Sequence, residues 1–146
     1  MDVLKINPWN LRKRVLPQNT DHAGVMWHGA YLSWMEEARV EALSQVGLEY
    51  VTLSSQGFEM PVVRLEINYL RALSHGDEVL LESWALPRDG ARWPWRTRFQ
   101  TLRNEIAAES KVELVFLKLS KTSRQVMRNP PDSIASALLE LQKGPN

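Results

Sequence analysis

Cysteine is absent from the 146 residues of this chain. A thiol nucleophile, a disulfide framework and a thiolate metal site are therefore excluded. The seven glycines form neither a phosphate-binding P-loop nor a G-x-G-x-x-G dinucleotide-binding turn. The nearest approach to the G-x-S-x-G elbow of serine hydrolases is Ser55-Gln56-Gly57, which has Leu53 where the first glycine is required. A phosphate-bearing ligand must therefore be held by surface side chains or by amides at a helix end.

A strong net charge and long apolar runs are also lacking. The 18 basic residues nearly balance the 17 acidic ones, so the chain has no field of the kind that nucleic-acid or membrane-surface binding requires. No apolar run approaches the length of a membrane span, and residues 1–8 lack the apolar core of a signal peptide. We therefore expect one cytoplasmic domain over residues 1–146, with no nucleic-acid or membrane partner.

The clearest element that is present is a long amphipathic helix from about Gly29 to Val46, with Gly47 where a helix C-terminus favours glycine. Its apolar face consists of Tyr31, Trp34, Met35, Ala38, Ala42 and Val46. Val40 and Leu43 fall on the opposite face, beside Glu36 and Glu37. The projection therefore predicts a buried face and some apolar surface left uncovered.

Alternation of apolar and polar residues predicts a sheet around this helix. The expected strands are 9–16, 63–69, 79–86, 93–101 and 106–119, and Pro94 predicts an edge position or a bulge in the fourth of them. A short helix or turn is expected over 49–56, and a C-terminal helix over about 132–142. The elements predict an α+β domain with an antiparallel sheet and a core over about 9–128.

One acid precedes the long helix by a single loop. Asp21 follows the turn-prone residues 17–19 and lies shortly before Gly29. Unpaired N–H groups at a helix N-terminus carry partial positive charge, so they can hold a carbonyl oxygen while an acid activates the attacking group. The pattern thus indicates acyl transfer. In the alternative interpretation, Asp21 only shapes an Asx-type turn.

The same segment resembles the active-site segment of the 4-hydroxybenzoyl-CoA thioesterase family of hotdog-fold acyl-CoA hydrolases. That family has an acid, a variable residue, a small residue, glycine, two aliphatic residues, an aromatic residue, and then histidine or tyrosine. The residues that match are Asp21, Ala23, Gly24, Val25, Met26, Trp27 and His28. The strand after Pro61 and the turn at Gly76-Asp77 are similar as well, and the resemblance covers about Arg12 to Arg128.

The resemblance implies a hotdog fold, in which the antiparallel sheet wraps around one long central helix. It implies Asp21 as general base or as nucleophile, and backbone N–H groups around His28, Gly29 and Ala30 as the oxyanion hole. It also implies a homodimer assembled to a homotetramer, with active sites at subunit interfaces. Coenzyme A belongs to the substrate, and no separate cofactor is expected. His22, His28 and Asp21 match no metal-ligand spacing, so no metal is expected.

The substrate follows less directly from the residues. Trp27 and Trp34 flank the loop and the helix start, so we expect them to narrow the pocket in favour of a small aromatic or short acyl-CoA. Arg88, Arg92 and Arg128 flank turns and are candidates for contacts to the coenzyme A phosphates, although solvated surface arginines would look the same.

Alternatives remain for both the acid and the reaction. Some hotdog thioesterases carry the acid on the central helix, which makes Glu36 and Glu37 secondary candidates. The side chain of His28 could also serve only to cap the loop. Instead of hydrolysis, the chain could bind acyl-CoA without cleaving it, or act as a hotdog hydroxyacyl dehydratase that pairs Asp21 with His28.

Overall fold

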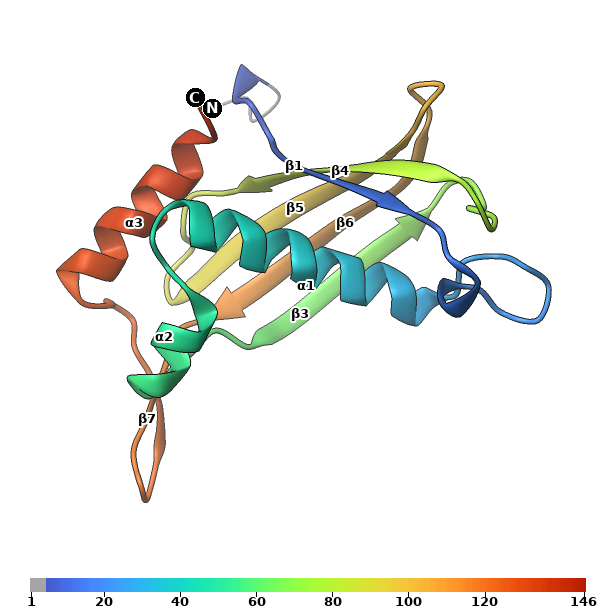
Figure 1. Ribbon diagram of the computed structural model, residues 1–146. Helices are drawn as coiled ribbons and strands as arrows, with labels where there is room; N and C mark the ends of the chain where they lie inside the picture. Colours follow the sequence, from blue (N-terminus) through green and yellow to red (C-terminus); the bar gives the residue numbers. More distant parts are fainter. Residues whose placement is uncertain (1–4) are drawn as a thin grey trace.

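The computed structural model describes residues 5–146, and its main layer is an antiparallel five-stranded sheet in the order β1-β4-β5-β6-β3. Its strands are β1 (Trp9–Arg14), β3 (Val62–Tyr69), β4 (Glu78–Ala85), β5 (Arg92–Thr101) and β6 (Ile106–Val115). The sheet curves around α1 (His28–Gln45), which crosses its concave face (Figure 1). This arrangement confirms the predicted α+β fold with one long helix against an antiparallel sheet.

A second, smaller sheet has the order β2-β7-β8. Its strands are β2 (Phe58–Glu59), β7 (Leu117–Leu119) and β8 (Arg124–Val126). The single strand expected over 106–119 is therefore wrong, because the chain leaves β6 at Phe116 before β7 begins. Phe116 is fully buried, and its oxygen accepts a hydrogen bond from the Met127 N–H (2.7 Å). Its ring also packs on Phe58, which fixes the break.

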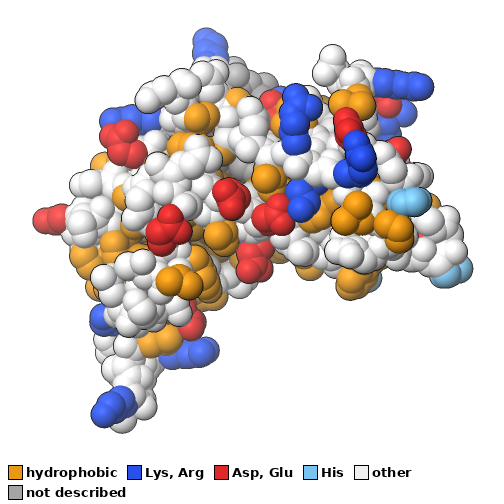
Figure 2. All heavy atoms as spheres, viewed as in Figure 1, with side chains coloured by type: hydrophobic (Ala, Val, Ile, Leu, Met, Phe, Trp, Pro, Cys, Tyr) orange, Lys and Arg blue, Asp and Glu red, His pale blue; other side chains and the backbone are white. Residues whose placement is uncertain are grey.

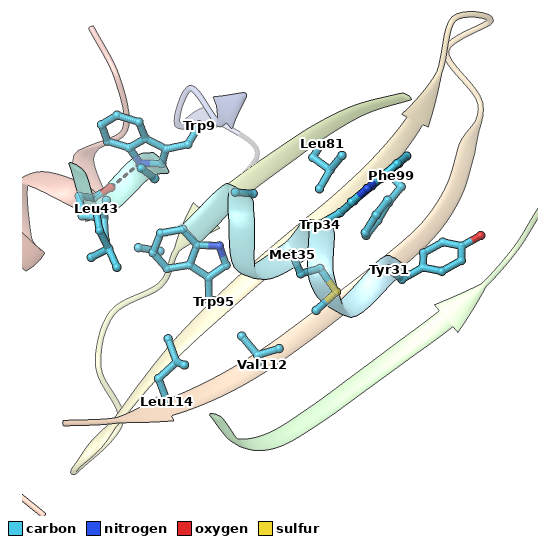
Figure 3. Close-up of a cluster of buried hydrophobic side chains, with 14 of the residues drawn as sticks. Trp9, Tyr31, Trp34, Met35, Leu43, Leu81, Trp95, Phe99, Val112 and Leu114 are labelled. Carbon is cyan, nitrogen blue, oxygen red and sulfur yellow. Dashed lines mark hydrogen bonds between the residues drawn. The ribbon is translucent and has the colours of Figure 1, made fainter. Parts of the chain in front are cut away.

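The remaining elements are η2 (Pro17–Asn19), α2 (Tyr50–Ser55) and α3 (Asp132–Lys143). The Trp9 indole N–H of β1 donates to the Leu141 oxygen (2.9 Å), which attaches α3 to the sheet (dashed line in Figure 3). Within residues 5–146, none of the helices combines the length and the apolar character needed to cross a membrane.

The core lies between the concave face of the sheet and the apolar face of α1. Tyr31 and Met35 of α1 meet Leu81, Phe99 and Val112 of the sheet (Figure 3). All five side chains are at most 3% exposed. Because β-strand side chains alternate between faces, the same strands carry charged pairs such as Arg98–Glu82 on the convex face.

The uncovered surface predicted on α1 is only partly present. Leu43 is 5% exposed, and the prediction that it lacks cover is wrong. It faces a space that α3 closes with Leu138 and Leu141, and Val40 lies half-buried beside it. A helical projection could not predict this cover, since α3 comes from the far end of the sequence.

The expectation of an edge position or a bulge at Pro94 is also wrong. β5 lies between β4 and β6, and Pro94 pairs with Glu113 in regular register. The backbone of Pro94 faces the end of β4, where its oxygen accepts a hydrogen bond from the Leu86 N–H (2.9 Å). The missing N–H therefore removes only one ladder hydrogen bond, at a strand end.

Candidate active site

The loop before α1 is folded tightly by backbone hydrogen bonds. The Asp21 N–H donates to the Val25 oxygen (2.8 Å), and Thr20 bridges to Met26. The Met26 N–H in turn donates to the Leu73 oxygen (2.7 Å), which ties the loop to the chain between β3 and β4. The position of Asp21 is therefore set by main-chain contacts on both sides of it.

The carboxylate of Asp21 uses only one of its two oxygens within this loop. Its Oδ1 accepts hydrogen bonds from the N–H groups of Ala23 (2.9 Å) and Val25 (3.2 Å). Its Oδ2 has no hydrogen-bond partner among residues 5–146, and the side chain is exposed. The Asx-type turn is thus present, and it leaves the second oxygen able to meet a ligand.

The first turn of α1 presents unpaired donors. The N–H groups of His28 and Gly29 have no partner among residues 5–146, whereas the Ala30 N–H donates to the Trp27 oxygen (3.0 Å). The two donors that the helix start offers to a ligand are therefore those of His28 and Gly29. Histidine side chains are exposed at this end of the molecule (Figure 2).

The indole ring of Trp27 lies directly on Gly29. A Cβ added at Gly29 would stand 2.2 Å from the ring atom Cη2 of Trp27. The ring is 46% exposed and meets the His28 ring edge-on, with centroids 5.3 Å apart. Trp27 is thus a wall beside the unpaired N–H groups, and glycine at position 29 makes room for it.

Trp34 does not share this role. It is 3% exposed and packs in the core near Leu81 and Phe99 (Figure 3). The prediction that Trp34 narrows the substrate pocket is therefore wrong, because its position on the helix turns it toward the sheet.

The three candidate arginines lie away from the acid loop within one chain. Arg88 donates to Asn129 Oδ1 (3.2 Å) in the segment that follows β8. Arg92 forms an ion pair with Glu113 at the start of β5, and Arg128 is exposed next to Asn129. All three therefore belong to the end of the sheet where β5 begins, whereas the acid loop packs near the other end, beside the β3–β4 connection.

The two helical glutamates differ in their surroundings. Glu37 forms an ion pair with Lys13 of β1 (3.0 Å). Glu36 borders a cavity of about 190 Å³ between α1, α3 and the starts of β3 and β5. Both side chains are exposed, as the projection predicted.

The sequence reasoning missed this cavity. Its walls include Arg39, Leu43, Trp93, Trp95, Pro61 and Leu138. Burial lowers the pKa of the Arg39 guanidinium below its ordinary value, and nearby Glu36 opposes that shift. The sequence did contain one sign of this cavity, because Arg39 lies one turn beyond Met35, beside the apolar face of the helix. The other walls come from segments far apart in the sequence and could not be associated by local pattern.

Among residues 5–146, no three histidine, aspartate or glutamate side chains are grouped so that they could hold a metal ion. A mechanism without a metal stays a prediction.

Comparison with known proteins gives consistent results. Residues 15–138 match the family described as the Thioesterase-like superfamily. A protein of Synechocystis with the provisional name of esterase is 34% identical over 131 residues, which are 89% of this chain and 78% of that protein. YneP of Bacillus subtilis, with the provisional name of acyl-CoA thioesterase, is 32% identical over 65 residues, 44% of this chain and 47% of YneP.

Among solved structures, DHNA-CoA thioesterase from Staphylococcus aureus is similar with a TM-score of 0.80. Its sequence identity is 23%, and the match covers 91% of this chain and 89% of that one. At this level of identity the likeness is one of fold. It confirms the sheet-wrapped helix that the sequence predicted.

Proposed function

Because the chain belongs to the thioesterase-like superfamily of hotdog-fold enzymes, and is a thioester hydrolase, we propose that it hydrolyses a small aromatic or short acyl-CoA to the free acid and coenzyme A. The observation that carries this proposal is that one hydrogen-bonded loop holds Asp21 and leads directly into the unpaired N–H groups of His28 and Gly29. The acid can activate an attacking oxygen while the N–H groups stabilise the charge that develops on the thioester oxygen.

Two routes use these groups equally well. As general base, Asp21 Oδ2 accepts a proton from water while the water oxygen attacks the thioester carbon and the coenzyme A thiolate leaves. As nucleophile, Oδ2 attacks that carbon itself, the thiolate leaves, and water then hydrolyses the mixed anhydride. In either route the His28 and Gly29 N–H groups donate to the carbonyl oxygen, and one such donor is typically worth about 10²–10³ in rate.

A second copy of the chain is part of the proposal. β3 is an edge strand, and all eight of its residues except Ile67 are exposed. Val62 and Leu65 are 39% and 40% exposed on its helix-facing side, where they pair with the buried Leu114 and Val112 of β6. Open apolar edges pair readily, so we propose that β3 pairs antiparallel with β3 of the second copy. The further pairing of dimers into a homotetramer follows the family resemblance.

This pairing would complete the site. Tyr31 of α1 contacts Tyr69 at the end of β3 (4.9 Å between ring centroids), whereas Pro61 and Val62 at its start line the cavity. A two-fold axis through the middle of β3 would bring the acid loop of one copy to the cavity end of the other. The arginines proposed for the coenzyme A phosphates, Arg88, Arg92 and Arg128, belong to that same end.

The test is release of free thiol from a panel of acyl-CoA esters. Asp21→Asn should keep the fold and lose activity by orders of magnitude, because an amide is neither base nor nucleophile. Glu37→Gln is the matched control, since Glu37 is an exposed acid already paired with Lys13. Normal kcat in Asp21→Asn with loss in Glu36→Gln would reassign the acid. Binding of esters without thiol release would refute hydrolysis, and sedimentation as a 16.8 kDa species alone would refute the dimer.

A further inference from the structure

Two tryptophans of β5 form part of the cavity wall beside α1. Trp93 and Trp95 are 7% and 3% exposed, and both line the cavity. Among residues 5–146, neither indole N–H has a hydrogen-bond partner. The two residues are separated by one position on β5, so both point to the sheet face that α1 covers. Both indole nitrogens are closed off from water-sized space, so the rings form part of the cavity wall but do not present their N–H groups to a ligand.

Arg39 also lines the cavity and brings a charged donor to it. Among residues 5–146 it forms no ion pair and no side-chain hydrogen bond, whereas six other arginines bind carboxylates. Glu36 lies one turn before Arg39 on α1 and borders the same cavity, and its charge acts on Arg39 although the two side chains form no ion pair. A partly buried guanidinium without a paired acceptor is costly, so a bound anion would stabilise it.

The size of the cavity limits the ligand. An apolar protein cavity of about 150 Å³ holds a benzene molecule, and this cavity has about 190 Å³. It therefore accepts one ring with a small substituent, or a short chain. Apart from Arg39, Glu36 and Gln142, much of its wall is apolar, including Leu43, Leu114 and Leu138. The occupant combines a small apolar body with an acceptor-rich group.

We propose that the cavity binds the acyl group of the substrate, and that this acyl group ends in a carboxylate held by Arg39. This inference rests on the proposed function, in which the thioester end meets Asp21 of the second copy. A carboxylate accepts the paired N–H groups of a guanidinium. A plain hydrocarbon end would leave the guanidinium of Arg39 unpaired.

Adipoyl-CoA and hexanoyl-CoA test the proposal, since they match in chain length and differ by the terminal carboxylate. The wild type should favour adipoyl-CoA in kcat/KM by about tenfold or more, because sites built for a polar group reject analogues that lack it. Arg39→Leu should abolish that preference while hexanoyl-CoA hydrolysis is retained, and Arg39→Lys should restore part of it. Arg96→Gln, on the convex face beside Glu109, is the control. A preference for hexanoyl-CoA, or one unchanged in Arg39→Leu, would overturn the proposal.

A binding experiment separates this inference from the proposed function. Free adipate and free hexanoate are titrated into the Asp21→Asn protein by calorimetry, which needs no turnover. Adipate that binds more tightly than hexanoate, and loses that advantage in Asp21→Asn combined with Arg39→Leu, supports the cavity assignment even if no ester is hydrolysed. Equal or absent binding of the two acids overturns it even if hydrolysis is confirmed. Arg39→Gln serves as a second variant at this position. The unfolding temperature of every variant shows whether a loss of binding is due to misfolding.

Discussion

The two ends of α1 offer different chemistry. At the N-terminal end, Asp21 and Trp27 are exposed, and the donors are backbone N–H groups. At the C-terminal end, the donor is the side chain of Arg39, in a cavity between α1, the sheet and α3 whose walls include Trp93 and Trp95. An open end with backbone donors suits bond cleavage, because the reacting group must enter and leave. A cavity with a side-chain donor suits selection of the acyl group, because side chains differ from one protein to the next.

The length of α1 sets how these ends can cooperate. Arg39 lies eleven residues beyond His28, which is roughly 16 Å along a helix axis. A ring-sized acyl group cannot span that distance within one chain. The comparison between the two ends therefore favours a site shared between two copies, with cleavage by one and selection by the other.

Mixing two inactive variants gives the largest expected effect. Asp21→Asn removes the acid, and Val40→Trp fills the cavity that Val40 borders. Each alone should lose about 10²-fold or more in kcat/KM. When the two variants are co-expressed, about half of the dimers contain one chain of each. In such a dimer one of the two sites combines an intact acid with an intact cavity, so about a quarter of wild-type activity should return. Activity that stays at the level of the single variants would place acid and cavity function in one chain.

The length of the acyl chain should have the next largest effect. A cavity of about 190 Å³ accepts a ring but not a long flexible chain. Benzoyl-CoA should therefore exceed palmitoyl-CoA in kcat/KM by about tenfold or more, where tenfold corresponds to about 1.4 kcal/mol. Leu138→Ala enlarges the cavity and should reduce the difference. A preference for long chains in the wild type would mean that the acyl group lies elsewhere.

Elements with local patterns were predictable from the sequence. The helix over about 29–46 and the acid loop followed from periodicity and from the position of Asp21, and the hotdog fold followed from the family resemblance of that segment. These features depend on residues close together in the chain. The break at Phe116 was not predictable, since it depends on a pairing with β2 and β8 that no local alternation shows.

The cavity is the clearest case of a feature that could not be predicted from the sequence. Trp93 and Trp95 read as core aromatics, and they are buried as expected. Their place in one cavity wall with Arg39 and Leu138 becomes visible only in the fold. Leu43 was misjudged for the same reason, since its cover comes from α3.

Gly29→Ala tests the contact between Trp27 and Gly29 at the open end of α1. Its effect on activity should be smaller than those of the two preceding experiments. The added Cβ would meet the Trp27 ring at 2.2 Å, so the indole must move from its place beside the unpaired N–H groups. We expect kcat/KM to fall by up to about tenfold, with little loss of stability because alanine favours helices. Combined with Trp27→Ala, the substitution should add no further loss, since the clash is gone. Equal losses in both backgrounds would mean that Gly29 acts independently of Trp27.

The smallest expected effect concerns the buried side of the same end. Burial, followed by the proximity of Tyr69, raises the pKa of Tyr31 from its ordinary 10.0 to about 12. The folded protein therefore keeps the Tyr31 proton at a pH where the unfolded chain loses it. The stabilisation is complete below pH 10 and is lost as the pH rises from 10 toward 12, with a slope of at most about 1.4 kcal/mol per pH unit for one proton.

Unfolding temperatures measured across this range should fall less steeply for Tyr31→Phe than for the wild type. If Tyr31→Phe and the wild type lose stability in parallel, burial does not raise the pKa of Tyr31. Water would then reach the inner side of the open end of α1.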